Sequence, residues 1–144
     1  MIRLKNWLPA LVLMMIIFAA SSIPGDAMPR FDEFDFSVKK LGHSLGYALL
    51  AISYFRGLKS INHKGHKEHE ENSSSFLVSF VTFVFKSPAF LAWLMAVIFA
   101  VSDEFHQSFT PGRNPSIWDV MIYDNFGAIA GVWIFHLIRK RKSP

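Results

Sequence analysis

The stretch PAFLAWLMAVIFAVSDEFHQSFTPGR, residues 88–113, joins an apolar run to a dense group of polar and charged residues. The apolar part approaches the roughly 20 residues that a helix needs to cross a bilayer. Ionisable residues at or inside a membrane are costly, so they usually mark a functional site. We therefore expect a membrane-spanning helix from Pro88 to about Phe105, with the functional site at its polar end.

Three further blocks are candidates for membrane-spanning helices: Trp7 to Pro24, Leu41 to Leu58 and Trp118 to Ile138. The middle block is the least apolar and carries His43 and Arg56 as its only potential charges. Together the four blocks predict an all-α membrane protein with about four transmembrane helices in one domain, residues 1–144. A cleaved signal peptide is the alternative for the first block, because Ala19-Ala20-Ser21 resembles a cleavage site.

Basic residues are distributed unevenly between the ends of these blocks. Eleven of the 15 Lys and Arg residues lie at the two termini or between Arg56 and Lys86: Arg3, Lys5, Arg56, Lys59, Lys64, Lys67, Lys86, Arg139, Lys140, Arg141 and Lys142. The other two loops hold only Arg30, Lys39, Lys40 and Arg113. Basic loops stay in the cytoplasm, so both termini are predicted to be cytoplasmic and residues 103–119 to face outward.

Composition narrows the chemistry and the partners. Without cysteine the chain can form neither a disulfide nor a Cys-ligated metal site. The net charge of +4 comes from basic residues that the predicted membrane topology already explains. We therefore expect membrane lipids as partners and no nucleic acid.

Residues 59–75 predict a disordered cytoplasmic linker, with metal binding by His63, His66 and His69 as the alternative. Residues 76–85 predict an interfacial helix or, alternatively, the start of the third span.

The second span carries a continuous face of larger side chains. His43, Tyr47, Leu50 and Tyr54 recur at helical spacing and therefore share one side of the helix. Gly42 and Gly46 lie beside this face and would allow a close helix contact. Two interpretations stay open for His43: part of a packing face, or a group that titrates or binds a ligand.

At the end of the third span, Asp103, His106 and Gln107 are spaced to converge on one face. Glu104 points roughly 100° away from Asp103 and so reaches other neighbours. Two adjacent carboxylates near an apolar boundary call for a cation, such as Arg113, Lys39, Lys40 or a bound metal. The alternative is a salt-bridge network at the membrane rim.

Thr110-Pro111-Gly112-Arg113 predicts a tight turn, with Pro111 at its second position and Gly112 at the position that favours a positive φ. The turn would present Arg113 near its tip. A guanidinium there could bind a carboxylate or phosphate through two nitrogens. The alternative is that Arg113 only pairs with Asp103 or Glu104.

The last span starts with Ser116-Ile117-Trp118-Asp119, which resembles a capping box and gives Asp119 a structural role. Asp124 lies about 8 Å deeper along the helix. It shares a face with Gly127, Ala128 and Gly131, where glycines four residues apart indicate close packing. Asp124 is therefore expected to face protein, either protonated or paired with a polar side chain such as His43, Tyr47 or Asn125.

The polar stretch and the helix after it resemble the core motif of the VanZ-like family. The matching residues are Asp103-Glu104-x-x-Gln107-x-Phe109-x-Pro111-Gly112-Arg113, then Ser116, Asp119, Asp124 and Gly127-Ala128-x-x-Gly131. Two shorter elements also fit, Ser21-Ser22-Ile23-Pro24 and Lys40-x-x-His43-x-x-x-Tyr47. Lys39 stands where the family usually has an acidic residue, and Asp35 is a potential substitute for it.

The resemblance implies a small multi-spanning protein of the bacterial cell membrane. The family's name comes from a protein linked to low-level resistance to lipid-tailed glycopeptide antibiotics, and the resemblance assigns no reaction. The first hypothesis is an envelope protein that binds an anionic lipid or a lipid-tailed glycopeptide at the outer leaflet, without a cofactor or metal. The expected ligand-binding residues are Lys40, His43, Tyr47, Asp103, Glu104, His106, Gln107, Arg113 and Asp124.

Two alternatives remain at this stage. One is a membrane enzyme that acts on a lipid-linked phosphate or cell-wall precursor, with Asp103, Glu104 and His43 or His106 as acid, base or metal ligands. The other is a proton-coupled carrier built around Asp124. Four spans are few for a carrier, so that function would need an oligomer formed through the glycine faces.

We expect reporter fusions at Pro144 and at Asn72 to be cytoplasmic and a fusion at Asn114 to be external. The reason is the unequal distribution of Lys and Arg over the two sides. Paired fusions with a reporter active only inside the cell and one active only outside it measure this. A cytoplasmic Asn114 would contradict both the topology and an outward-facing site.

Overall fold

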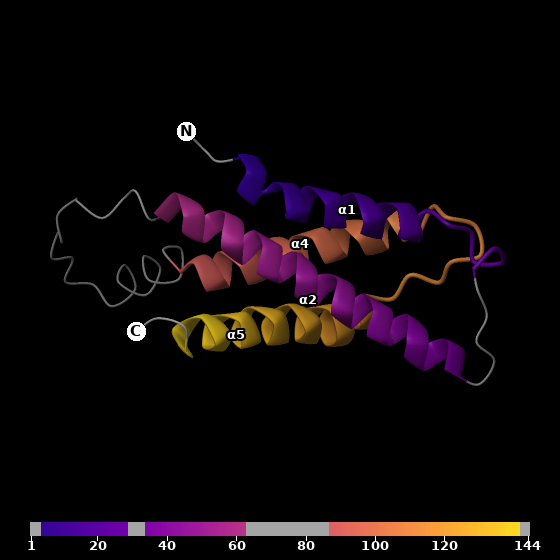
Figure 1. Cartoon of the computed structure of the whole chain (residues 1–144). Helices are drawn as coiled ribbons and strands as arrows, with labels where there is room; N and C mark the ends of the chain where they lie inside the picture. The colour runs from indigo at the N-terminus through magenta and orange to yellow at the C-terminus, as the bar shows by residue number, and fades with distance from the viewer. Residues whose placement is uncertain (1–3, 29–33, 63–86, 142–144) are drawn as a thin grey trace, which may run out of the picture.

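A computed structural model describes residues 4–28, 34–62 and 87–141, and these ranges form helices and no strand. The elements are η1 (Leu4–Asn6), α1 (Leu8–Ser21), α2 (Asp35–Asn62), α4 (Pro88–Gln107), η3 (Asp119–Asp124) and α5 (Asn125–Arg141). Figure 1 shows the four long helices side by side as one elongated bundle. The all-α prediction is confirmed.

The helices alternate in direction along the bundle (Figure 1). The start of α1, the end of α2, the start of α4 and the end of α5 lie together at one end. At the opposite end lie the residues that follow α1 and those that connect α4 to η3. We call this second end, with residues 22–28 and 108–118, the loop end.

The second helix is longer than its apolar block. It begins at Asp35 and ends at Asn62, so the first four residues of the predicted linker 59–75 are helical. Neither Gly nor Pro interrupts the sequence between Gly57 and Gly65. The positive charge of Lys59 in the last turn also stabilises the helix, because it lies near the negative end of the helix dipole. The rest of that linker and the predicted helix at 76–85 lie outside the described residues.

α2 contacts each of the other three long helices and holds the core. Tyr47, Leu50 and Tyr54, from the face predicted to be shared with His43, are all buried. They pack with other buried side chains of α2 and α4: Ala51, Phe55, Ala92, Ala96 and Ala100. The alanines recur every four residues on α4 and form one smooth face, against which the larger side chains of α2 pack.

α5 approaches α2 most closely at two glycines. A Cβ atom added at Gly127 would overlap the backbone of Ser44, and one added at Gly131 would lie 2.5 Å from the carbonyl oxygen of Ala48. The predicted packing role of Gly127 and Gly131 is therefore confirmed. Their position brings the start of α5 and the preceding η3 against the first half of α2.

The predicted helix contact at Gly42 and Gly46 is wrong. No heavy atom lies within 4 Å of a Cβ added at Gly42, and a Cβ at Gly46 meets only the Ile17 side chain, at 3.9 Å. The small residues of α2 that do touch a neighbouring helix closely are Ser44 and Ala48, on another side of α2. Gly42 and Gly46 instead leave space between α1 and α2.

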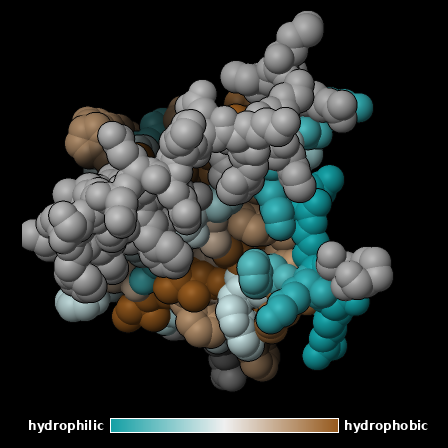
Figure 2. Space-filling model, turned by 90° about the vertical axis from the view of Figure 1, so that its left-hand side faces the viewer, coloured by the Kyte–Doolittle hydropathy of each residue, from teal (hydrophilic) through white to brown (hydrophobic). Residues whose placement is uncertain are grey.

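Two stretches, Pro88–Gln107 and Asp119–Arg141, are long and apolar enough to cross a membrane by length and composition. α1 is apolar but has only 14 residues. Only 28% of each long stretch is buried inside the chain, and large side chains such as Phe126 (71% exposed) face outward. In Figure 2, which views the end opposite the loop end, hydrophobic surface adjoins a strongly hydrophilic side.

We expect Gly127→Ala to destabilise the fold by about 1–3 kcal/mol. The added methyl group overlaps the backbone of Ser44, so α2 and α5 must move apart. Gly42→Ala is the matched control, because the same methyl group meets open space and the helix propensity of alanine is better. Thermal unfolding of both purified variants measures the difference. Equal melting temperatures would contradict the close contact.

Candidate functional site

The loop end of the bundle buries a carboxylate where three helices meet. Asp103 of α4 is 3% exposed. Its Oδ2 accepts hydrogen bonds from Ser21 Oγ of α1 at 2.8 Å, from Gln107 Nε2 at 2.9 Å and from Tyr47 OH of α2 at 3.3 Å. The predicted convergence of Asp103 and Gln107 is confirmed. Asp103 Oδ1 is buried without a hydrogen-bond partner among the described residues.

Glu104 turns away from Asp103, as their adjacent positions on a helix predicted. It is 8% exposed, and its Oε2 accepts a hydrogen bond from the backbone N–H of Ser116 at 2.7 Å. Glu104 therefore ties α4 to the segment that leads into η3. His106 has other contacts: its Nε2 lies 3.0 Å from Ser22 Oγ, and its ring stacks on Phe18 at 4.3 Å between centroids.

Two residues of α2 contact two carboxylates of η3. Lys40 forms an ion pair with Asp119, and His43 Nδ1 lies 3.2 Å from Asp124 Oδ1. Lys40 and His43 are three residues apart, so they share one face of α2. Of the partners predicted for Asp124, His43 is the one observed. Asn125 instead accepts a hydrogen bond from Trp93 Nε1 at 2.6 Å.

The π-helical geometry of η3 explains how both aspartates reach α2. In an α-helix, residues five apart such as Asp119 and Asp124 point roughly 140° away from each other. A π-helix joins residues five apart by its hydrogen bonds, so their side chains lie on the same side of the helix. η3 covers Asp119 to Asp124. The α-helical period used for the sequence could not reveal this alignment.

The capping box predicted at Ser116 and Asp119 does not form. The backbone N–H of Ser116, which the Asp119 side chain would have to satisfy, donates to Glu104 instead. The Asp119 carboxylate pairs with Lys40. The carboxylate predicted to be structural therefore belongs to the polar cluster between α2 and η3.

The predicted turn at residues 110–113 is confirmed. Gly112 has a φ of 69°, and the N–H of Arg113 donates to the carbonyl of Thr110 at 3.2 Å. The turn also joins the other connection at the loop end, because the N–H of Gly25 donates to Pro111 O at 3.0 Å. It therefore holds the α4–η3 connection against the residues that follow α1.

Arg113 is held by the end of α1. Its Nε donates to the carbonyl of Ile23 at 3.0 Å, and its Nη2 donates to the carbonyl of Ala20. No carboxylate among the described residues lies within ion-pair distance of it. Burial lowers the pKa of the Arg113 guanidinium, and the charges of Asp103 and Glu104 oppose this. The usual pKa is so high that the side chain stays charged at neutral pH.

A cavity of about 380 Å³ lies between α1 and α2. Ile16 and Ile17 line it from one side, and Gly42 and Gly46 from the other. A second cavity of about 200 Å³ adjoins it at the loop end. Four residues line both cavities: Met28, Lys39, His43 and Arg113. The first is mainly apolar and the second mainly polar, so together they fit a molecule with an apolar tail and a charged head.

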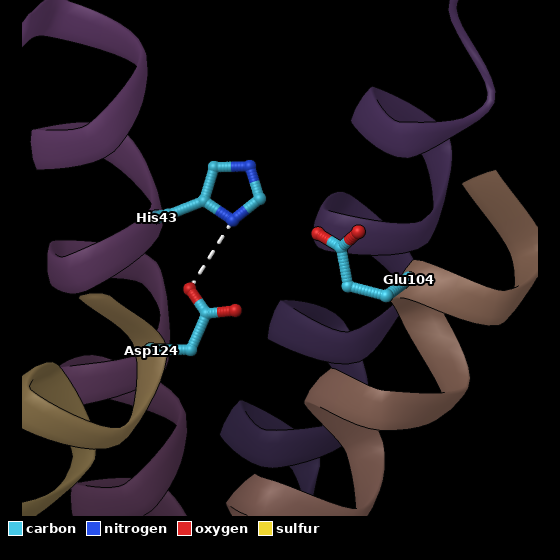
Figure 3. Close-up of side chains that lie close together, drawn as sticks. All are labelled: His43, Glu104 and Asp124. Atoms are coloured by element: carbon cyan, nitrogen blue, oxygen red, sulfur yellow. Dashed lines mark hydrogen bonds and ion pairs between the residues drawn. The ribbon is translucent and has the colours of Figure 1, made fainter. Parts of the chain in front are cut away.

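A further group of side chains lies beside these cavities. One potential ligand atom from each of His43, Glu104 and Asp124 falls within 4.8 Å of the other two. Figure 3 shows the carboxylate of Glu104 facing the other two side chains across a shared space. The site thus combines residues of α2, α4 and η3 that are distant in sequence.

Most of the candidate ligand-binding residues therefore lie at the loop end, in two connected groups. In the first group, Tyr47 and Gln107 donate hydrogen bonds to Asp103. In the second, Lys40, His43 and Asp124 lie at the contact between α2 and η3. Sequence reasoning missed Ser21 as the donor to Asp103 and the backbone of Ser116 as the partner of Glu104. The only feature of the sequence that pointed to Ser21 was its position in the short motif Ser21-Ser22-Ile23-Pro24.

Residues 6–139 match the VanZ/LLP1 family. This match covers most of the chain, so the protein belongs to the VanZ/LLP1 family. No curated protein and no solved structure matches the chain.

We expect Arg113→Lys to destabilise the protein by about 1–2 kcal/mol, because lysine cannot hold both carbonyls with a planar fork. The value is at the low end for charged hydrogen bonds since the side chain is partly exposed. Arg139→Lys, the same change in an exposed last turn of α5, should have no effect. Thermal unfolding of both variants tests this. An unchanged melting temperature for Arg113→Lys would show that these two bonds do not hold the loop end.

Proposed function

We propose that this chain is a multi-pass protein of a bacterial cell membrane. It binds an amphiphile with an anionic head at the outer leaflet, either a lipid phosphate or a lipid-tailed glycopeptide. The observation that carries the proposal is the pair of adjoining cavities, one apolar and one polar. In this role the protein contributes to tolerance of glycopeptide antibiotics.

The outer surface of the bundle supports the membrane part of the proposal. Soluble monomers rarely expose large continuous apolar patches, yet fewer than a third of the residues in each long apolar stretch are fully buried, and large side chains such as Phe105 and Phe126 are exposed. Lipid would cover this surface. The basic residues Arg139, Lys140 and Arg141 in the last turn of α5 suit a cytoplasmic end. The loop end would then face outward.

The position of the apolar cavity supports entry of the ligand's apolar chain directly from the bilayer. At its rim, Ile16 is 57% exposed and Val38 is 39% exposed. Both would lie on the lateral surface of the bundle, between α1 and α2. Gly42 and Gly46 carry no side chains that would close the space. An acyl or prenyl chain could therefore move from the bilayer into the cavity without passing through water.

The charges at the junction of the two cavities support an anionic head. Lys39, His43 and Arg113 line both cavities, whereas the carboxylates of Asp103 and Asp119 line one cavity each. The position where the family usually has an acidic residue is occupied by Lys39, which adds positive charge here. Lys39 and Arg113 therefore bring positive charge to both cavities, and we assign the head group to these two residues together.

We expect purified protein in detergent to bind farnesyl phosphate more tightly than farnesol, which lacks the charge. Gly46→Leu should weaken both by about tenfold or more, because the new side chain fills the apolar cavity. Gly46→Ala is the matched control, since its methyl group meets Ile17 at an ordinary distance. Native mass spectrometry measures the bound fraction, with thermal unfolding as the test of folding. Unchanged binding by a folded Gly46→Leu variant would contradict the proposal.

An enzyme acting on a lipid-linked phosphate is the second candidate. The observation that favours it is the group of His43, Glu104 and Asp124 beside the polar cavity. Release of inorganic phosphate from farnesyl phosphate over time would distinguish turnover from binding. The third hypothesis, a proton-coupled carrier, receives no specific support, because the contact with His43 already explains how Asp124 is buried.

A further inference from the structure

We propose that His43, Glu104 and Asp124 bind one divalent transition-metal ion. The three side chains come from α2, α4 and η3, and the close contact between α2 and α5 helps to hold two of them together. This inference does not depend on the amphiphile, because it rests on the spacing of three donor atoms and not on the cavities, although His43 belongs to both sites.

The spacing of the donor atoms suits one ion. All three lie within 4.8 Å of one another, whereas two ligands of one zinc ion span about 4.2 Å at most. Where a pair is as far apart as 4.8 Å, side-chain rotation would have to close it by about 1.5 Å to reach the spacing of neighbouring ligands in a tetrahedral site. His43 Nδ1 and Asp124 Oδ1 are already 3.2 Å apart, close to the roughly 3.0–3.4 Å between neighbouring ligands of one ion.

A buried oxygen of Asp124 without a hydrogen-bond partner supports a cation at this place. Asp124 is 1% exposed, and its Oδ2 has no hydrogen-bond partner among the described residues. Figure 3 shows this second oxygen on the side that faces Glu104. A buried carboxylate oxygen without a partner is costly, and a metal ion is one of the few groups that can satisfy it.

The charge balance points the same way. Asp103, Glu104 and Asp124 are all buried. Within the described ranges, the ion pairs at this end are Lys40 with Asp119 and His43 with Asp124. Neither of these neutralises Glu104, and the nearby charged Arg113 donates to the carbonyls of Ile23 and Ala20 without forming an ion pair with Glu104 among the described residues. A divalent cation between Glu104 and Asp124 would offset both carboxylates and would leave Lys40 with Asp119.

The donor set indicates which ions to expect. Imidazole suits zinc and its neighbours in the first transition row, and carboxylates also suit manganese. One imidazole with two carboxylates therefore favours Zn²⁺ and Mn²⁺ over Mg²⁺. Three protein ligands leave at least one coordination position open, as in catalytic zinc sites.

The test needs a background without competing histidines. Metal could also bind to three other histidines, His63, His66 and His69. Every form of the protein used in the test should therefore carry Ser at these three positions. Metal-free full-length protein in detergent is titrated with Zn²⁺, Mn²⁺ and Mg²⁺ by calorimetry. We expect one Zn²⁺ per chain, weaker binding of Mn²⁺ and still weaker binding of Mg²⁺. Absence of saturable Zn²⁺ and Mn²⁺ binding would overturn the proposal.

The decisive variant is Glu104→Gln, which keeps an acceptor for the Ser116 N–H but loses the charge. We expect it to weaken Zn²⁺ binding about tenfold or more, and Asp124→Asn to do the same. Asp26→Asn and His136→Gln are controls of the same chemistry outside the cluster and should bind normally. Full affinity in folded Glu104→Gln would overturn the proposal.

X-ray absorption gives an independent readout on the zinc-loaded protein. One imidazole among oxygen ligands is expected, and that imidazole should disappear in His43→Gln. An all-oxygen site in the unsubstituted cluster would contradict the assignment.

Discussion

The close approach of α2 and α5 at Gly127 and Gly131 is the constraint on which the loop end depends. A side chain at either glycine would push the helices apart. With the helices in contact, Ser44 Oγ can donate to the carbonyl of Tyr123 at 2.9 Å, and His43 can reach Asp124 one residue further along. The glycines are thus required for polar contacts that they do not make themselves.

The buried carboxylates at the loop end have two different roles, one in joining the helices and one in a potential ligand site. Oδ2 of Asp103 accepts hydrogen bonds from neutral donors of α1, α2 and α4, and these bonds fix the helices relative to one another at this end. Glu104 and Asp124 have fewer partners, and they face the same space from opposite sides. Adjacent positions on α4 therefore serve two purposes: Asp103 joins the helices, and Glu104 contributes to a potential ligand site.

The sequence predicted those parts of the structure that follow from regular helices. Apolar blocks located the four long helices, and the spacing of Asp124, Gly127 and Gly131 indicated a face that packs on protein. The turn at Gly112 followed from its residue types. These features depend on local geometry with a known period, so they can be read from residue order.

Other features depend on where distant segments meet, and residue order could not reveal them. Glu104 satisfies the N–H of Ser116, which leaves Asp119 for Lys40 and abolishes the expected capping box. Arg113 contacts carbonyls at the end of α1, although its sequence neighbours suggested an anion. Gly42 and Gly46 resemble a packing pair but border a cavity, because another side of α2 faces α5.

The π-helical segment η3 has a consequence for how the chain tolerates changes in length. Within an α-helix, removing one residue rotates everything that follows by about 100°. The last helix carries its carboxylates in η3 and its glycines in α5, and each set must meet α2 at its own angle. If a single residue between Asp119 and Asp124 were lost, the carboxylates and the glycines could no longer both face α2. Restoring the contact of one set would turn the other set away. Insertions and deletions should therefore be rarer in this segment than exchanges of one side chain for another.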